Sequence, residues 1–234
     1  RPPRSTLFPY TTLFRSKMIE ESPSAAVSSE LREKMGHAAV TAAKAAGYVN
    51  AGTIEFLLEP DGKFWFMEMN TRIQVEHPVT EWVTGIDLVK EQLKIASGMP
   101  LEISQEDVRI QGHAIECRIN AENPQKNFRP SPGTIQGAHF PGGNGIRVDT
   151  CVYNGCKIPP YYDSMLAKLI VHAGNRKEAI AKMQSALGEV IIDGIDTNID
   201  YQYEILKDED YQSGNFDTGF LASHIIAGVK INEN

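Results

Sequence analysis

The sequence predicts an α+β protein in two parts: the end of an α/β domain, followed by a domain rich in antiparallel strands. An alanine-rich helical pattern extends from about Ser29 to Ala46, and two β-prone runs flank Asp61-Gly62. After Pro100 the pattern changes to short β-prone runs separated by proline and glycine clusters. This change near Pro100 predicts the transition between the two parts.

The first part is predicted to contain a helix and then a hairpin. The helix at 29–46 opens with serine and closes at Gly47, a residue type that favours a left-handed C-terminal cap. The runs 53–59 and 63–70 lie on either side of Asp61-Gly62, which is a strong hairpin signal.

A second helix is predicted at 86–97. Thr84 and Asp87 have the capping-box spacing at its start, and Gly98 ends it. The second part is predicted to contain four strands, at 112–119, 133–139, 145–152 and 165–172. A helix at 176–187, a short strand near 190 and a last helix at 199–207 are predicted to follow them.

Composition excludes several classes of protein. The 234 residues include 30 acids and 23 bases, and the net charge of -7 argues against a general nucleic-acid or membrane-surface binder. Apolar runs are only a handful of residues long, so no transmembrane helix is expected. Three cysteines are too few for a disulfide scaffold and indicate a reducing compartment, so we expect a cytoplasmic protein.

Residues 1–16 are predicted not to belong to the natural protein. The stretch from Thr6 to Ser16 is, letter for letter, the translation of a common sequencing adapter, and the segment follows neither a helical nor a strand period. We therefore expect a non-native, adapter-derived segment followed by natural sequence from about Lys17. A native mobile arm is the alternative.

Two acids are predicted to face each other in the hairpin. If Asp61-Gly62 forms a two-residue turn, Glu55 lies directly opposite Glu68, and Asn70 shares the face of Glu68. Like charges in such a pair destabilise a sheet, whereas two carboxylates and an amide oxygen suit Mg²⁺. The alternative is two solvated acids on an open face, and a one-residue change of register would separate them.

The segment after the hairpin carries polar side chains at a spacing of two. If the chain stays extended, Arg72, Gln74 and Glu76 project to one side and continue the row of Glu68 and Asn70. Arginine offers a planar fork to a carboxylate-like anion, and a glutamate beside that anion is a candidate base. The pattern indicates anion binding with proton transfer; an edge strand with a polar outer face is the alternative.

These residues form part of a longer pattern that resembles a known family. The stretch 68–81, EMNTRIQVEHPVTE, is similar to the signature of biotin carboxylases, within the ATP-grasp superfamily. The resemblance covers 17–234 and implies the C-terminal part of an ATP-grasp domain at 17–108 and a biotin carboxylase C-terminal domain at 109–234. Further matching motifs are GTIEF at 52–56, AIECRINAE at 114–122, PSPG at 130–133, PPYYDSM at 159–165 and IDGIDTN at 192–198.

The resemblance implies a metal and nucleotide site. Glu55, Glu68 and Asn70 match the positions that bind Mg²⁺, or Mn²⁺ in its place. Glu68 also counts among the ATP-binding positions, together with Leu57 and Ile195, which resemble adenine-pocket residues. For Leu57 and Ile195, plain core packing is the alternative.

The resemblance also implies a site for bicarbonate and biotin. Arg72, Gln74 and the backbone of Val75 match the positions that hold bicarbonate. Glu76 matches the base that deprotonates bicarbonate, and Arg118 matches the arginine that serves both bicarbonate and the biotin enolate. The implied catalytic residues are therefore Glu76, Arg118 and Arg72.

The implied activity is that of an ATP-dependent ligase. MgATP and bicarbonate would drive carboxylation of biotin on a carrier protein, the first half-reaction of acetyl-CoA carboxylase in fatty acid biosynthesis. Lys17 falls where the family has a lysine near bicarbonate and the phosphates. The family's N-terminal domain and ATP lid would lie upstream of Lys17, so we expect the present chain alone to be inactive.

The implied partners are a biotin carboxyl carrier protein, carboxyltransferase subunits and a second copy in a homodimer, with no nucleic acid and no membrane. Two alternatives are the biotin carboxylase part of another acyl-CoA or pyruvate carboxylase, and a different ATP-grasp carboxylate–amine ligase. A non-catalytic remnant is a third possibility, disfavoured by the presence of Glu55, Glu68, Asn70, Glu76 and Arg118.

Overall fold

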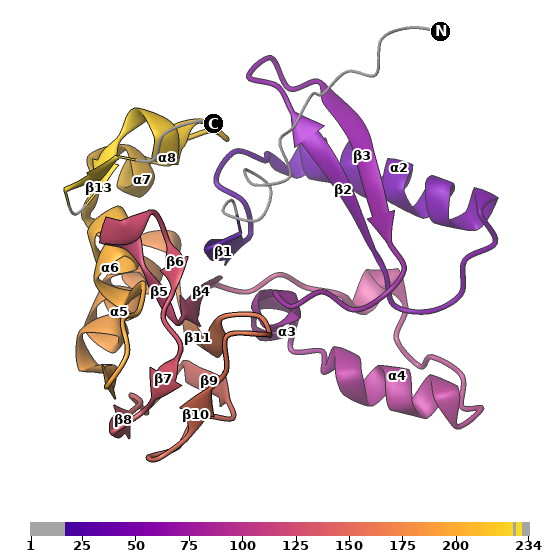
Figure 1. Cartoon of the computed structure of the whole chain (residues 1–234). Helices are drawn as coiled ribbons and strands as arrows, with labels where there is room; N and C mark the ends of the chain where they lie inside the picture. Colours follow the sequence, from indigo (N-terminus) through magenta and orange to yellow (C-terminus); the bar gives the residue numbers. More distant parts are fainter. Residues whose placement is uncertain (1–16, 227, 231–234) are drawn as a thin grey trace, which may run out of the picture. The chain divides into compact units, whose positions relative to one another are not determined.

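The computed structural model describes residues 17–226 and 228–230 (Figure 1). The predicted adapter segment, 1–16, lies outside these described residues. The chain divides into two compact units, one of residues 22–111 and one that combines 17–21 with the chain from 112 onward. In the part of the chain that the structure describes, no helix combines the length and apolarity needed to cross a lipid bilayer.

The first unit begins with the alanine-rich helix α2 (Ser29–Ala45). The Ser28 side chain accepts a hydrogen bond from the Leu31 N–H at 3.2 Å and caps the helix. Gly47 follows with φ +64°, so the predicted left-handed cap is confirmed. The other elements of this unit are the strands β2 (Thr53–Leu58) and β3 (Phe64–Asn70), the helices α3 (His77–Thr84) and α4 (Leu88–Ala96), and the 3₁₀ helix η1 (Gln105–Asp107).

The hairpin of β2 and β3 has a longer turn than predicted. The Glu59 N–H donates to the Lys63 carbonyl at 2.8 Å, so the loop contains three residues, 60–62, rather than two. Gly62 adopts φ +83°, the left-handed position that ends such a loop. The prediction of a two-residue turn at Asp61-Gly62 is therefore wrong.

A β-bulge restores the register farther from the turn. Met67 is an extra residue in β3, so Glu55 still lies opposite Glu68 and Thr53 lies opposite Asn70. The shift from the longer loop and the shift from the bulge cancel each other. The predicted facing pair of acids is therefore correct, although the predicted turn is not.

The helices after the hairpin differ from the predicted helix at 86–97. Helix α4 begins at Leu88, and the Asp87 side chain caps it. Thr84 does not cap α4, because it ends α3 and its hydroxyl donates to the Thr80 carbonyl at 2.7 Å. The eight residues of α3 are too few for a clear helical period, which explains why the sequence pattern does not predict this helix.

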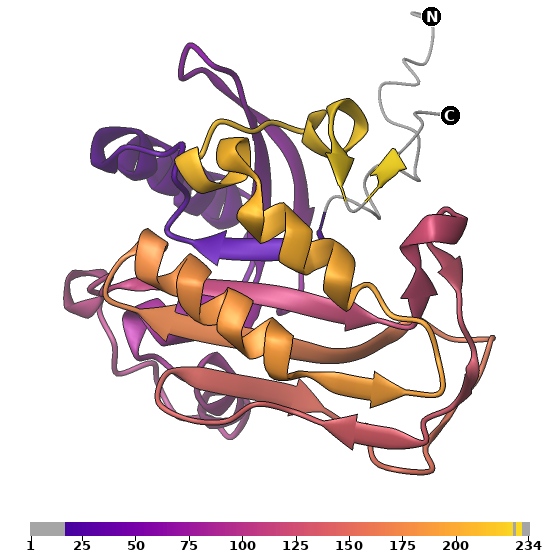
Figure 2. The ribbon, with the colours of Figure 1, turned by 90° about the vertical axis from the view of Figure 1, so that its left-hand side faces the viewer.

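The second unit is built on a four-stranded sheet with the order β1-β4-β11-β9. Its strands are β1 (Ile19–Ser22), β4 (His113–Asn120), β11 (Met165–Ala173) and β9 (Ile146–Thr150). Strand β11 pairs antiparallel with both β4 and β9, as the predicted antiparallel part requires. Figure 2 shows helices α5 (Arg176–Glu189) and α6 (Ile199–Lys207) lying across one face of this sheet.

The core of the second unit lies between the sheet and these helices. Alternate residues of β4, which are Ile115, Cys117 and Ile119, are fully buried in it. Met183 and Leu187, one helical turn apart on α5, belong to the same core. The remaining side chains of β4 therefore occupy the face of the sheet that the helices do not cover.

Short ribbons and helices complete the second unit. They are the pairs β5 (Glu122–Asn123) with β6 (Arg129–Pro130), β7 (Gly133–Thr134) with β10 (Lys157–Ile158), β8 (Gly137–His139) with β12 (Ile191–Asp193) and β13 (Ile225–Ile226) with β14 (Val229–Lys230), the 3₁₀ helix η2 (Pro124–Lys126), and the helices α7 (Glu209–Ser213) and α8 (Phe220–Ser223).

Strand β1 belongs to the sheet of the second unit, whereas the sequence grouped its residues with 17–108. A largely buried carboxylate, Glu21, contributes to this placement. It accepts hydrogen bonds from His113 at 2.9 Å and from the Arg176 Nε at 2.7 Å. Arg176 also donates to the carbonyls of Tyr211 and Gln212. One acid on β1 thereby joins the start of β4, the start of α5 and the α7 segment.

We expect Glu21→Ala to destabilise the second unit by about 3 kcal/mol, because it removes the carboxylate shared by buried His113 and half-buried Arg176. Burial by itself raises the pKa of Glu21, but hydrogen bonds from His113 and Arg176 outweigh it and hold this pKa below the usual 4.5. The contribution of Glu21 to the free energy of unfolding should therefore be present above about pH 4.5. It should decline as the pH falls through the pKa of Glu21 in the folded protein.

Urea unfolding of the two variants Glu21→Ala and Glu30→Ala provides the measurement. Glu30 pairs with Lys34 on the exposed side of α2, where screening by water leaves an ion pair little net effect on stability. Equal and small losses in both variants would contradict the role assigned to Glu21.

Candidate functional site

The candidate site lies at the end of the β2–β3 hairpin that is remote from the turn. Glu55 and Glu68 stand directly opposite each other there, with Asn70 two residues farther along β3. The Asn70 Nδ2 donates to the Glu55 Oε1 at 3.1 Å and to the Glu68 Oε1 at 2.9 Å. A single amide therefore lies between two carboxylates whose like charges repel each other.

Two further side chains close a ring of hydrogen bonds with these residues. The Arg72 guanidinium donates through Nη2 to the Asn70 Oδ1 and through Nη1 to the Gln74 Oε1, both at 3.3 Å. The Gln74 Nε2 then donates to the Glu55 Oε1 at 3.0 Å. Arg72 and Glu55 are thus joined twice, through the two amides of Asn70 and Gln74.

The segment 71–76 is not extended, contrary to the sequence expectation. Strand β3 ends at Asn70, the chain bends, and Glu76 becomes the N-cap residue of α3. Pro78 stands in the first turn of this helix, a position where its fixed φ suits the start of a helix. That proline is the sequence signal that could have predicted the bend.

The bend still brings Arg72 and Gln74 to the acids. Gln74 is buried, with 7% of its surface exposed, and His77 forms a 2.8 Å hydrogen bond to the Gln74 carbonyl. Glu76 and Val75 are half-buried at the start of α3, and no row of side chains continues from β3 to them. The structure therefore groups five of the predicted residues: Glu55, Glu68, Asn70, Arg72 and Gln74.

The other predicted residues are distributed over both units. Leu57 is half-buried in β2, opposite Trp65. Lys17, Arg118 and Ile195 belong to the second unit. Ile195 packs against the core of that unit, which fits the packing alternative that the sequence left open.

Arg118 is held by its backbone in β4. Its N–H donates to the Met18 carbonyl at 3.0 Å, and its carbonyl accepts hydrogen bonds from Asn198 at 3.0 Å and from Gln202 at 2.8 Å. The Asn198 Oδ1 also accepts a hydrogen bond from the Asn120 N–H at 2.8 Å. The Asn198 side chain therefore bonds the backbone of two residues of β4. Both amide side chains are fully buried.

Asn198 and Gln202 are positioning residues that the sequence analysis misses. Asn198 is the N-cap residue of α6 and Gln202 lies one turn farther along, and an amide pair at that spacing beside a largely apolar helix face is the available signal. The signal does not say which strand the amides contact, because the contacts to Arg118 span 80 and 84 residues.

The donor set of Glu55, Glu68 and Asn70 fits a hard divalent cation. Two carboxylates and one amide supply oxygen ligands, which Mg²⁺ requires, and Mg²⁺ commonly leaves its remaining positions to water and substrate phosphates. The chemistry of the residues present therefore agrees with the metal site expected from the sequence.

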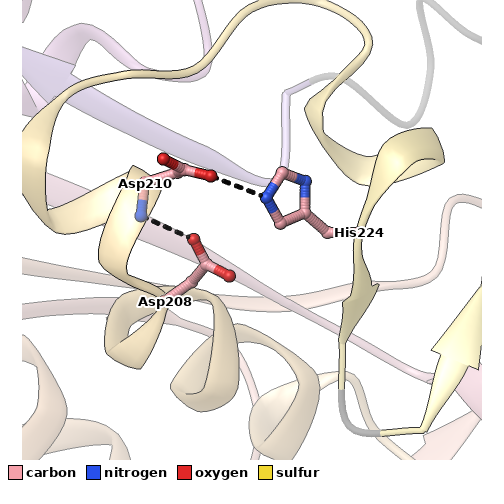
Figure 3. Close-up of side chains that lie close together, drawn as sticks. All are labelled: Asp208, Asp210 and His224. Carbon is pink, nitrogen blue, oxygen red and sulfur yellow. Dashed lines mark hydrogen bonds and ion pairs between the residues drawn. The ribbon is translucent and has the colours of Figure 1, made fainter.

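A second polar cluster, drawn in Figure 3, lies near the C-terminus in the second unit. His224 donates through Nε2 to Asp210 at 3.0 Å, and its Nδ1 lies 2.9 Å from the Phe220 carbonyl. Asp208 caps α7 by accepting the N–H groups of Asp210 and Tyr211. Since helix capping and an ion pair account for these three side chains, the cluster ties the end of α8 to α7.

Comparisons with known proteins agree with the fold. A family profile described as "Biotin carboxylase C-terminal domain" matches residues 116–223, and one described as "Carbamoyl-phosphate synthase L chain, ATP binding domain" matches residues 10–104. The chain is 58% identical over 213 residues to Biotin carboxylase 1 of Bacillus subtilis (strain 168), covering 91% of this chain and 47% of that protein. It therefore spans about half the length of the curated relatives it matches.

Two further relatives have other names. One is a pyruvate carboxylase subunit from Methanothermobacter thermautotrophicus, which is 56% identical over 205 residues, 88% of this chain and 42% of that protein. The biotin carboxylase domain dimer of Hydrogenobacter thermophilus 2-oxoglutarate carboxylase, solved with MgADP, ADP and bicarbonate, superimposes with a TM-score of 0.85. That match has 50% identity and covers 87% of this chain and 45% of the other. These likenesses confirm the family resemblance and the α+β, ATP-grasp-type fold expected from the sequence.

Raising the pH is expected to loosen the attachment of α8 to α7. The hydrogen bond to Asp210, and then the Phe220 carbonyl, raise the pKa of His224 above the ordinary 6.5. The Asn215 amide, followed by His224, holds the pKa of Asp210 below 3.8. The pair is therefore fully formed between about pH 3.8 and about pH 6.5. It is lost as the pH rises through the raised pKa of His224 or falls through the lowered pKa of Asp210.

Amide hydrogen exchange of residues 220–224, corrected for its intrinsic pH dependence, checks this expectation at about pH 5.5 and about pH 8.5. His224→Gln should remove the difference in protection between the two conditions. His139→Gln, which replaces an exposed histidine of β8, should retain it. Equal protection of the unsubstituted protein at both pH values would contradict the assignment.

Proposed function

The chain belongs to the biotin carboxylase family, and we propose that in the complete protein it takes part in the MgATP- and bicarbonate-dependent carboxylation of biotin on a carrier protein. The observation that carries this proposal is the ring of hydrogen bonds that joins two facing acids to an arginine and a glutamine. Two acids suit a cation and a guanidinium suits an anion, so the ring supports adjacent sites for the two ligands. The chain covers 47% of its Bacillus subtilis relative, so the activity belongs to the complete protein and the chain alone is proposed to be inactive.

In this proposal Glu55, Glu68 and Asn70 hold the divalent cation, Mg²⁺ or Mn²⁺. The cation would offset negative charge on the phosphoryl group as it leaves ATP. Glu68 also serves the nucleotide, and Leu57 is proposed for the adenine pocket. The same role for Ile195 is the weaker assignment, because its side chain packs against the core of the second unit.

Arg72, Gln74 and the backbone of Val75 would hold bicarbonate. A guanidinium with several donors in one plane suits a planar oxyanion. Glu76, at the start of α3 two residues after Gln74, would remove the bicarbonate proton and so create the nucleophile. Bicarbonate oxygen then bonds to the γ-phosphorus of ATP and ADP leaves. The resulting carboxyphosphate breaks down to CO₂ and phosphate.

Arg118 would stabilise the biotin enolate. Phosphate takes the N1′ proton of the ureido ring, negative charge develops on the ureido oxygen, and the enolate nitrogen bonds to CO₂. A guanidinium aimed at that oxygen acts as an oxyanion-type stabiliser. Asn198 and Gln202 fix the backbone from which Arg118 projects. Lys17 is proposed near bicarbonate and the phosphates.

The final acyl acceptor and the assembly are further parts of the proposal. Acetyl-CoA carboxylase in fatty acid biosynthesis and pyruvate carboxylase are two candidate settings. The 56% identity to a pyruvate carboxylase subunit favours the second setting as much as the first. A biotin carboxyl carrier protein, carboxyltransferase subunits and a second copy of the chain are the proposed partners, as in the dimeric biotin carboxylase domain it resembles. The proposed location is the cytoplasm.

We expect Glu55→Gln and Glu68→Gln each to weaken Mn²⁺ binding by the complete protein roughly tenfold or more, because each removes one charged oxygen ligand. Electron paramagnetic resonance of free Mn²⁺ measures this affinity directly. The matched control is Glu59→Gln on the same hairpin, whose carboxylate instead accepts the indole N–H of Trp65 at 2.8 Å. Unchanged Mn²⁺ affinity in the first two variants would exclude this metal site.

Arg118→Ala should lower biotin-dependent turnover of the complete enzyme by on the order of 100-fold or more, because the enolate loses its stabilising charge. Phosphate release and carboxybiotin formation, measured with and without biotin, provide the test. Arg129→Ala on β6, an exposed arginine of the same unit, is the control. A complete protein that carboxylates biotin at the normal rate without Arg118 would refute the assignment, and failure of the unsubstituted protein to carboxylate biotin would refute the function.

A further inference from the structure

We propose that Asn70 is a positioning residue that occupies an Nη2 N–H of Arg72, and so weakens anion binding there, until a divalent cation turns the Asn70 side-chain amide. This inference rests on the proposed function, since it concerns the same cation and the same bicarbonate. It adds a coupling between the two ligands, carried by one amide that both neighbours share.

The two ends of the Asn70 amide face different partners. Its Nδ2 donates to both carboxylates, Glu55 at 3.1 Å and Glu68 at 2.9 Å, and its Oδ1 accepts from the Arg72 Nη2 at 3.3 Å. An amide offers only donors at one end and only acceptors at the other. In this orientation Asn70 presents hydrogens to the acids and its oxygen to the guanidinium.

A cation between the acids requires the opposite orientation. Mg²⁺ and Mn²⁺ accept oxygen ligands, and N–H hydrogens of Asn70 cannot ligate them. A half-turn about the Cβ–Cγ bond brings Oδ1 toward Glu55 and Glu68, but it brings Nδ2 to the position that faces the Arg72 Nη2. Two donors cannot share a hydrogen bond, so this half-turn breaks the contact between Asn70 and Arg72.

Arg72 stays attached after that change. Its Nη1 donates to the Gln74 Oε1 at 3.3 Å and to the Ile73 carbonyl at 3.2 Å, and neither bond involves Asn70. The guanidinium therefore keeps its place beside buried Gln74 while the Nη2 N–H that Asn70 had accepted becomes available to an anion. Cation binding thus prepares the arginine and does not dislodge it.

Thermodynamic linkage makes the effect reciprocal. If the cation strengthens bicarbonate binding by some factor, bicarbonate strengthens cation binding by the same factor. We expect a factor of roughly ten, within the usual range for coupled sites. Direct attraction between a cation and an anion would also give a positive linkage, so the test must separate this attraction from the amide's role.

Substitution of Asn70 separates the two effects. Asn70→Ala removes the acceptor that occupies Arg72, so bicarbonate should bind the metal-free complete protein several-fold more tightly than it binds the unsubstituted protein. In Asn70→Ala, the increase in bicarbonate affinity caused by Mg²⁺ should be smaller. Only the part due to direct attraction between Mg²⁺ and bicarbonate should remain. Asn70→Asp should act in the opposite sense, because a carboxylate pairs with Arg72 more strongly than an amide oxygen does. Thr71→Ala, at the exposed neighbouring position, should change neither affinity.

The experiment is a titration of the complete protein with ¹³C-labelled bicarbonate, followed by nuclear magnetic resonance in EDTA and in saturating Mg²⁺. Tighter metal-free binding by Asn70→Ala together with weaker metal-free binding by Asn70→Asp supports the proposal. Metal-free binding by Asn70→Ala that equals or falls below that of the unsubstituted protein overturns it.

If Asn70→Ala does not fold, Asn70→Asp decides the question, and unchanged metal-free affinity in that variant overturns the proposal. The proposed function itself fails if the unsubstituted protein binds no bicarbonate in either EDTA or Mg²⁺. Circular dichroism must then show that the unsubstituted protein and the Thr71→Ala control are folded.

Discussion

The facing carboxylates of Glu55 and Glu68 impose the constraint on which the arrangement of the first unit's polar side chains depends. Like charges directly opposite each other in an antiparallel pair are unfavourable, so the hairpin needs a positive or donating group between them. The Asn70 amide supplies the donors, and Gln74 adds a second donor to Glu55. Both amides then have oxygens to satisfy, and Arg72 satisfies both. The acids thus account for the whole ring.

In the second unit, hydrogen bonds fix the backbone of a charged residue, Arg118, within a strand. Arg118 lies in β4, whose Ile115, Cys117 and Ile119 side chains enter the core between the sheet and the helices. Two fully buried amides, Asn198 and Gln202, donate hydrogen bonds to the Arg118 carbonyl. Asn198 also accepts a hydrogen bond from the Asn120 N–H. Buried amides are costly when their hydrogen bonds are unmade, so these contacts resist displacement of the strand. Glu21 gives the same kind of anchorage to the start of β4.

Prediction from sequence succeeds here where the signal is local and fails where it is not. The cap at Gly47 and the hairpin depend on residues close in sequence, and both are confirmed. The turn is wrong because a three-residue loop and a two-residue loop share the Asp-Gly signal. The facing pair is nonetheless right, since the bulge at Met67 compensates for the loop. Helix α3 is missed because its eight residues are too few for a clear helical period.

The sequence by itself determined the family, the α+β class and the residue types that metal and anion chemistry need. Only the tertiary structure decided which of them meet. The bond between Gln74 and Glu55 spans 19 residues, and the bond between Arg176 and Glu21 spans 155. Periodicity and capping patterns report on neighbours within a few turns of chain. Contacts across such separations depend on the register, the bulge and the packing of whole elements, which no local pattern contains.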